Sequence, residues 1–123
     1  MGITFNGIAQ SNEALEDFAS LLGRFDLEQK FELWISASGG QSISMLRNGS
    51  NAWLMYLRFE GDSGSVTKGA QDHDATCTYM LANGQVDEYP LRWCIPIDQC
   101  YEAIAHFIRT NGGRYDLVAW QES

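Results

Sequence analysis

Residues 52–59 (Ala-Trp-Leu-Met-Tyr-Leu-Arg-Phe) constrain the fold more than any other segment of the chain. Most side chains in this run are apolar, so both faces of an extended segment would need cover. The Asn-Gly pair at residues 48–49 favours the positive backbone angles of a tight hairpin turn just before it. Residues 31–36 and 43–46 precede that turn and have the composition of strands. The sequence therefore predicts a sheet in which residues 52–59 form a central strand.

Two segments carry apolar residues at the spacing of an amphipathic helix. The first runs from Ser11, which can cap a helix, to Gly23, which is expected to end it. The second follows Pro96 and stops at the Asn-Gly-Gly of residues 111–113. Its apolar face is expected to contain Ile97, Cys100, Tyr101, Ile104, Phe107 and Ile108.

Shorter extended segments complete the prediction. They are residues 3–9, 66–67, 76–81 and 117–120, with a second Asn-Gly turn at 83–84. An antiparallel meander is the simplest way to join these strands. The predicted fold class is α+β, with a single antiparallel β-sheet packed against two amphipathic helices in one domain over residues 1–123.

The charge of the chain limits the kinds of partner it can bind. It has 16 acidic and 8 basic side chains, a formal net charge of −8, and its basic residues are scattered singly. Affinity for nucleic acid needs clustered lysine and arginine, so we expect no direct nucleic-acid binding and a basic partner if the partner is charged. An acidic surface also serves solubility alone. No apolar run is long enough to cross a membrane and no secretion signal is visible, so we expect a cytoplasmic protein without membrane contact.

Three patterns resemble catalytic or metal sites, but each lacks the further residues or the spacing that such a site needs. Residues 61–64 (Gly-Asp-Ser-Gly) match the tetrapeptide around a serine-protease nucleophile, but both histidines follow it and the chain is too short for two β-barrels. Residues 72–74 (Asp-His-Asp) are adjacent, so they cannot all face one ion from a regular element. The cysteines, Cys77, Cys94 and Cys100, lack zinc-site spacing. We therefore expect no catalytic residue, no metal and no cofactor.

Three pieces of the chain together resemble one protein family. They are residues 52–58 running into 61–64 and closed by Lys68-Gly69, residues 85–90, and a helix ending at Phe107 followed by Gly113-Arg114 and residues 118–120. Their order and spacing resemble the immunity-protein-one family of bacterial polymorphic toxin systems over about residues 31–122. Members often carry proline after the Gly-Arg pair, where this chain has Tyr115.

This resemblance implies a small α+β protein that binds and inhibits a cognate toxin. Nucleic-acid deaminases are among the toxins encoded beside the family, so a DNA or RNA deaminase is the implied partner. The resemblance also implies mainly structural roles for Trp53, Pro90 and Trp120, and it does not identify the surface that contacts the toxin.

The acidic residues suggest where that surface lies. A toxin that acts on DNA or RNA presents a basic cleft, and an inhibitor can fill that cleft with carboxylates and gain electrostatic steering. The acidic side chains gather around residues 60–74 and 87–88, and an aromatic anchor of the kind common at interface hot spots follows. The candidate partner-binding residues are Glu60, Asp62, Asp72, Asp74, Asp87, Glu88 and Tyr89.

Two other interpretations stay open at this stage. One is a general protein-binding adaptor domain without a toxin partner. The other is an unrecognised hydrolase that uses Cys77 or Ser63. The sequence also leaves open the oligomeric state and whether inhibition occurs by occlusion or by distortion of the toxin.

Overall fold

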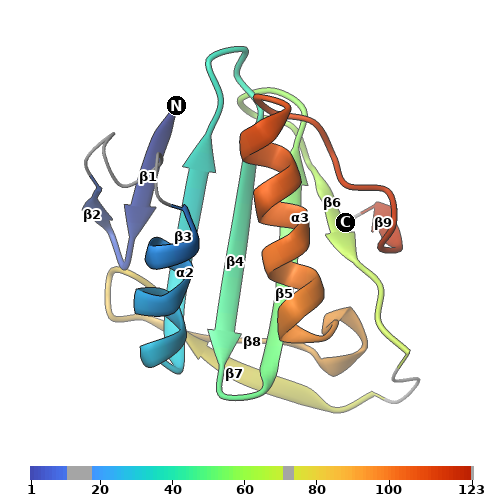
Figure 1. Ribbon diagram of the computed structural model, residues 1–123. Coiled ribbons are helices and arrows are strands. Elements are labelled where there is room, and N and C mark those ends of the chain that lie inside the picture. Colours follow the sequence, from blue (N-terminus) through green and yellow to red (C-terminus); the bar gives the residue numbers. More distant parts are fainter. Residues whose placement is uncertain (11–17, 71–73, 123) are drawn as a thin grey trace.

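The computed structural model describes residues 1–10, 18–70 and 74–122. Its main layer is a seven-stranded antiparallel sheet with the strand order β2-β1-β3-β4-β5-β6-β9 (Figure 1). The strands are β1 Gly2–Phe5, β2 Ile8–Ala9, β3 Lys30–Ser36, β4 Ser42–Asn48, β5 Asn51–Leu57, β6 Ser65–Thr67 and β9 Trp120–Glu122.

The prediction of a central strand is confirmed by β5, which lies between β4 and β6. Its neighbouring residues Trp53 and Leu54 point to opposite faces of the sheet, and both are buried. The predicted tight turn joins β4 to β5, but it lies one residue later than expected, because Asn48 pairs with Asn51 and the loop consists of Gly49, at a φ of 62°, and Ser50. Both faces of the sheet centre are therefore covered, as the apolar run requires.

The helix α3 (Ile97–Arg109) covers one face of the sheet (Figure 1). Cys100, Ala103, Ile104 and Phe107 are buried, and they belong to the same cluster as Leu54 and its neighbours on β3 and β4. The prediction of a helix after Pro96 is thus confirmed. The fold is α+β, a mostly antiparallel sheet with one long helix.

The shorter helix α2 (Phe18–Leu27) departs from the expected boundaries. The expected end at Gly23 is wrong, because the helix continues for another turn and Phe25 is 1% exposed. Phe25 stacks on Phe5 at 4.3 Å between ring centroids, and burying such a ring outweighs the helix cost of one glycine, about 1 kcal/mol. The expected cap Ser11 lies outside the described residues.

The opposite face of the sheet is covered in part by a separate hairpin, β7 (Thr76–Met80) with β8 (Val86–Pro90) (Figure 1). The expectation of one single sheet is therefore wrong in this region. Trp53, Leu46 and Val66 of the large sheet pack with Tyr79 of β7 in a second apolar cluster. The predicted turn at 83–84 closes this hairpin, with Gly84 at a φ of 86°. A short 3-10 helix (Leu91–Trp93) leads from β8 towards α3.

The two edges of the large sheet also differ from expectation in detail. The stretch 3–9 contains a hairpin, because Asn6 and Gly7 both take positive φ values of 51° and 80° and turn β1 into β2. The closing strand begins at Trp120 instead of residue 117, since Leu117 is 84% exposed and precedes the pairing with β6. Within the described ranges, no helix is long and apolar enough to cross a membrane.

Candidate functional site

The β7–β8 hairpin is held against the sheet by an aromatic cluster. Tyr89 on β8 lies 4.8 Å from Trp53 and 5.8 Å from Trp93, measured between ring centroids. Tyr79 on β7 packs edge-on to Trp53 at 6.4 Å. Because the hairpin alternates its side chains between two faces, Tyr79 and Tyr89 point inward and their neighbours point outward. Tyr89, the candidate aromatic anchor of an interface, is therefore half-buried and holds the hairpin against the sheet.

Three of the candidate carboxylates lie along this hairpin. Glu88 is exposed on its outer face, where Thr76 Oγ1 donates to it at 3.4 Å. Asp87 lies on the inner face and accepts hydrogen bonds from Gln85 Nε2 at 3.0 Å and from the Tyr89 hydroxyl at 3.4 Å. Asp74 precedes β7, fully exposed, with its carboxylate 3.9 Å from Arg92. The structure thus gathers these carboxylates on or next to the hairpin.

The other candidate carboxylates lie elsewhere. Glu60 is exposed and follows the end of β5, whereas the hairpin crosses the beginning of β5, where Asn51 Nδ2 donates to Cys77 Sγ at 3.5 Å. The structure therefore places Glu60 at the opposite end of this strand from the hairpin. Asp72 lies outside the described residues.

Asp62 near Glu60 has a local role within its loop. Its carboxylate accepts from the Arg58 backbone N–H at 2.9 Å, from Nε at 3.0 Å and from Nη2 at 3.1 Å. These hydrogen bonds and the arginine charge hold the pKa of Asp62 well below its ordinary value. Its side chain is only 4% exposed. Asp62 shapes the loop after β5, and its charge is compensated.

A groove lies beside the hairpin on the same face of the sheet, and the sequence did not point to it. It has a volume of about 150 Å³. Its walls come from β3, β4 and β5 of the large sheet and from β8 of the hairpin, with the side chains of Glu32, Trp34, Ser44, Trp53, Met55 and Tyr89. The alternation along β3 contained a signal, because Phe31, Leu33 and Ile35 form the helix-facing row and leave Glu32 and Trp34 on the other face.

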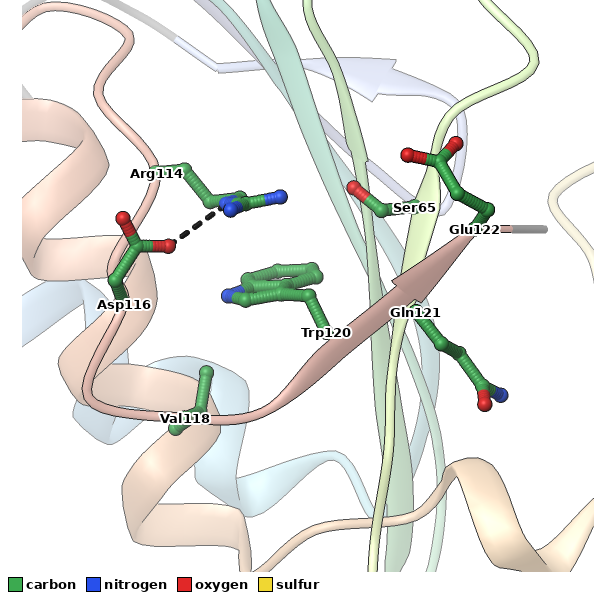
Figure 2. Close-up of a pocket in the computed structure, with 7 residues that line it drawn as sticks. All are labelled: Ser65, Arg114, Asp116, Val118, Trp120, Gln121 and Glu122. Atoms are coloured by element: carbon green, nitrogen blue, oxygen red, sulfur yellow. Dashed lines mark hydrogen bonds and ion pairs between the residues drawn. The ribbon is translucent and has the colours of Figure 1, made fainter.

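A second, larger hollow of about 480 Å³ lies at the edge formed by β6 and β9 (Figure 2). Arg114 lies over the Trp120 ring at 5.8 Å from the centroid, and its Nε is 2.8 Å from Asp116 Oδ1. Trp120 Nε1 donates to the Tyr115 carbonyl oxygen at 2.8 Å. These contacts pair the polar groups of residues 114–120 with one another, and the pairing of β9 with β6 attaches this segment to the sheet.

The thiols are arranged for packing. Cys94 Sγ lies 3.2 Å from the Tyr79 hydroxyl, and burial raises the pKa of Cys94. Burial also raises the pKa of Cys100, which lies on the sheet-facing side of α3 and is fully buried. Nucleophilic cysteines need the opposite shift, towards the thiolate. Cys77 is half-exposed and accepts weak hydrogen bonds from Asn48 and Asn51.

The remaining chemical candidates do not converge on a site in the described part of the chain. Among those residues no group of three or more histidine, cysteine, aspartate or glutamate side chains is placed to hold a metal ion. His106 on α3 packs against Tyr115 at 5.4 Å between ring centroids. His73, in the Asp-His-Asp of residues 72–74, lies outside the described residues.

Comparison with known proteins identifies a family. The family model described as immunity protein Imm1 matches residues 24–122, which is most of the chain. No curated protein matches the sequence. The matched range contains the β7–β8 hairpin, the groove beside it and the Arg114 hollow.

Proposed function

Because this chain belongs to the Imm1 family of immunity proteins, we propose that it binds one cognate toxin and inhibits it by covering the active-site cleft of that toxin. The proposed toxin is a deaminase that acts on DNA or RNA. In this proposal the chain performs no catalytic step itself, and it acts in the cytoplasm, where a toxin of this kind would find its substrate.

The acidic hairpin is the observation that carries the proposal. Asp87 and Glu88 lie on β8 and Asp74 lies two residues before β7, on a chain with a net charge of −8. An enzyme acting on nucleic acid needs a basic cleft to hold phosphates, and carboxylates on a rigid hairpin can occupy that cleft in their place. Arg92 lies 3.9 Å from Asp74, and both side chains are exposed to water, so this ion pair is weak. Most of the negative charge of these carboxylates is therefore available to a partner.

Occlusion is the mode of inhibition that fits a firmly held hairpin. The Tyr89, Trp53 and Trp93 rings pack together under it, and Asn48 Nδ2 donates to the Thr78 carbonyl oxygen at 2.7 Å. A preorganised element loses little conformational entropy on binding. Glu60 lies at the far end of β5, so we propose that it adds to the long-range field and that the hairpin makes the direct contact. Asp62 is paired with Arg58, and we assign it no direct contact.

The test uses the protein encoded by the gene next to that of this chain. The proposal expects that co-expression of the two proteins restores growth of cells that the toxin alone kills. It also expects that a tagged immunity protein retains the toxin through purification and lowers its deaminase rate in vitro. Cells that die despite co-expression, together with a toxin that does not copurify, would contradict the proposal and favour an adaptor role.

A further inference from the structure

The groove beside the hairpin has the size of a site for one side chain. Its volume of about 150 Å³ is well below the roughly 300–1,000 Å³ of pockets that hold small-molecule ligands. It opens on the face of the sheet opposite α3, next to the acidic hairpin. A single projecting side chain from a bound protein is therefore the occupant that fits.

Aromatic rings form much of the groove wall. Trp34 on β3 is half-buried, and Trp53 and Tyr89 close the side next to the hairpin. The face of an indole attracts a cation, and the attraction is stronger where water is partly excluded. The walls thus favour a positively charged and flat occupant over a neutral one.

Two carboxylates supply the charge of the site: Glu32 in the groove wall, and Asp87 beside the groove, next to Tyr89. Glu32 lines the groove, and its oxygens accept from Trp34 Nε1 at 2.8 Å and from the Ala82 backbone N–H at 3.2 Å. Asp87 accepts from the hydroxyl of Tyr89, whose ring lines the groove. Both carboxylates act on Tyr89, because burial, the charge of Asp87 and then that of Glu32 raise the pKa of its hydroxyl.

Neither carboxylate has a counter-ion among the residues that the structure describes. The ion pairs there join other carboxylates: Asp26, Asp62, Asp74 and Asp116. Lys30, two residues before Glu32 on the same strand, is exposed and makes no ion pair with it. Each carboxylate oxygen keeps lone pairs that a further donor can use. The groove therefore carries negative charge that no described basic side chain neutralises.

Trp53, which lines the groove, also carries a buried polar group. Trp53 is 2% exposed, and its buried Nε1 has no hydrogen-bond partner among the residues that the structure describes. Buried N–H groups nearly always have an acceptor, and an unpaired one is a cost that a bound group can remove. A protein segment in the groove would bring backbone carbonyl oxygens as well as its side chain.

From these observations, and resting on the function proposed above, we propose that the groove receives an arginine side chain of the toxin. The guanidinium stacks on the Trp34 indole and donates to Glu32 and Asp87. Arginine fits better than lysine because its flat group has five donors in a fixed geometry, so it can stack and reach two carboxylates at once. A nucleic-acid enzyme offers such side chains, because it binds phosphates with arginine and lysine.

A binding experiment without the toxin tests the groove itself. The blocked peptide acetyl-Gly-Arg-Gly-amide is titrated into the 15N-labelled protein at low salt, and the indole N–H signals of the four tryptophans are followed. We expect saturable shifts of the Trp34 and Trp53 signals in the millimolar range, and no such shifts with the citrulline peptide, which has the same shape without the charge. Equal shifts with citrulline, or shifts confined to Trp120, would overturn the proposal.

Two variants and a matched control make this test specific. Glu32→Gln and Asp87→Asn should each weaken arginine binding about threefold to tenfold, because each removes one charge from the site. Glu28→Gln makes the same chemical change at an exposed position at the end of α2 and should leave binding unchanged. Asp87→Asn keeps the proposal testable if Glu32→Gln disturbs the sheet. Unchanged binding in both groove variants would overturn it.

Copurification with the toxin separates this proposal from the proposed function. If the toxin is inhibited and retained equally by wild type and both groove variants, the function stands and the arginine site is wrong. If the peptide binds as expected but the toxin is neither retained nor inhibited, the proposed function fails instead. If the protein self-associates and Glu32→Gln abolishes this self-association, a second copy of this chain occupies the groove. That result would overturn the assignment of the groove to the toxin.

Discussion

The Trp53 and Tyr89 rings, 4.8 Å apart between centroids, join the central strand of the large sheet to the β7–β8 hairpin. Trp53 is 2% exposed, so the ring of Tyr89 is one of the surfaces that complete its burial. Position and orientation of the acidic hairpin therefore depend on this aromatic contact. Packing of these rings positions the hairpin, and the hairpin in turn positions the carboxylates of the proposed site.

Tyr89→Ala should destabilise the protein by about 2–3 kcal/mol, because it leaves a cavity next to Trp53 at a half-buried position. Tyr89→Phe should cost less than about 1 kcal/mol, because it keeps the ring and removes only the 3.4 Å hydrogen bond to Asp87. Urea unfolding followed by circular dichroism gives both values. Equal losses in the two variants would show that the hydroxyl group holds the hairpin, and the ring does not.

Charge reversal on the hairpin should slow association with the toxin. Glu88→Lys and Asp74→Lys replace exposed carboxylates, so we expect association rates about threefold to tenfold lower at low salt and a smaller effect at 0.5 M salt, where the Debye length is only about 4 Å. Glu28→Lys makes the same change at the end of α2 and serves as the control. Stopped-flow fluorescence measures the rates. A similar slowing by all three variants would mean that only net charge matters and that the hairpin is not the contact.

Much of the fold could be predicted because its signals are local. The Asn-Gly pair at 48–49 and the two-sided apolar run after it define the central hairpin within a short stretch of chain. The site could not be found in this way. Glu32 and Tyr89 line the same groove because a separate hairpin packs on the face of the sheet opposite α3. The sequence pattern of β7 indicates that one of its faces is buried, but it does not indicate which part of the protein covers that face. The extension of α2 beyond Gly23 likewise depends on tertiary packing, because it buries Phe25 against Phe5.

The thiols should react in a fixed order. Cys77 is half-exposed, while Cys94 and Cys100 are buried and their pKa values are raised by that burial. In the native protein we expect one thiol to react with iodoacetamide at the rate of an ordinary exposed cysteine, and the other two to react at least about 100-fold more slowly until urea unfolds the chain. Mass spectrometry of the labelled peptides identifies the sites. Labelling of Cys77 far faster than a free thiol would revive the hydrolase interpretation.

Asp62 should give the protein a specific sensitivity to acid. Its hydrogen bonds with Arg58 hold its pKa in the folded state below the ordinary value of 3.8. A group with a lowered folded-state pKa contributes stability above its unfolded-state pKa and loses it as pH falls towards the folded-state value. The difference in unfolding free energy between wild type and Asp62→Asn should therefore be constant from about pH 5 to 7 and shrink below about pH 4. When Arg58→Gln is also present, Asp62→Asn should change the unfolding free energy less at pH 7, because the arginine partner of Asp62 is already absent. A difference that stays unchanged down to pH 2.5 would contradict the assignment.

Two glycines should respond in opposite ways to alanine. A Cβ atom at Gly69 would lie 1.8 Å from the Cys94 carbonyl oxygen, and the Gly69 backbone N–H also donates to the Arg92 carbonyl oxygen at 2.7 Å. Gly69→Ala must therefore push apart the segment after β6 and the segment after β8, and we expect a loss of at least about 3 kcal/mol or a failure to fold. At Gly23, inside α2, a Cβ atom meets nothing within 4 Å, so Gly23→Ala should stabilise the protein by about 0.5–1 kcal/mol. Thermal unfolding of the two variants beside wild type measures both effects. A tolerated Gly69→Ala would mean that these segments do not approach as closely as the structure places them, and the orientation of the acidic hairpin, which depends on the second segment, would then need revision.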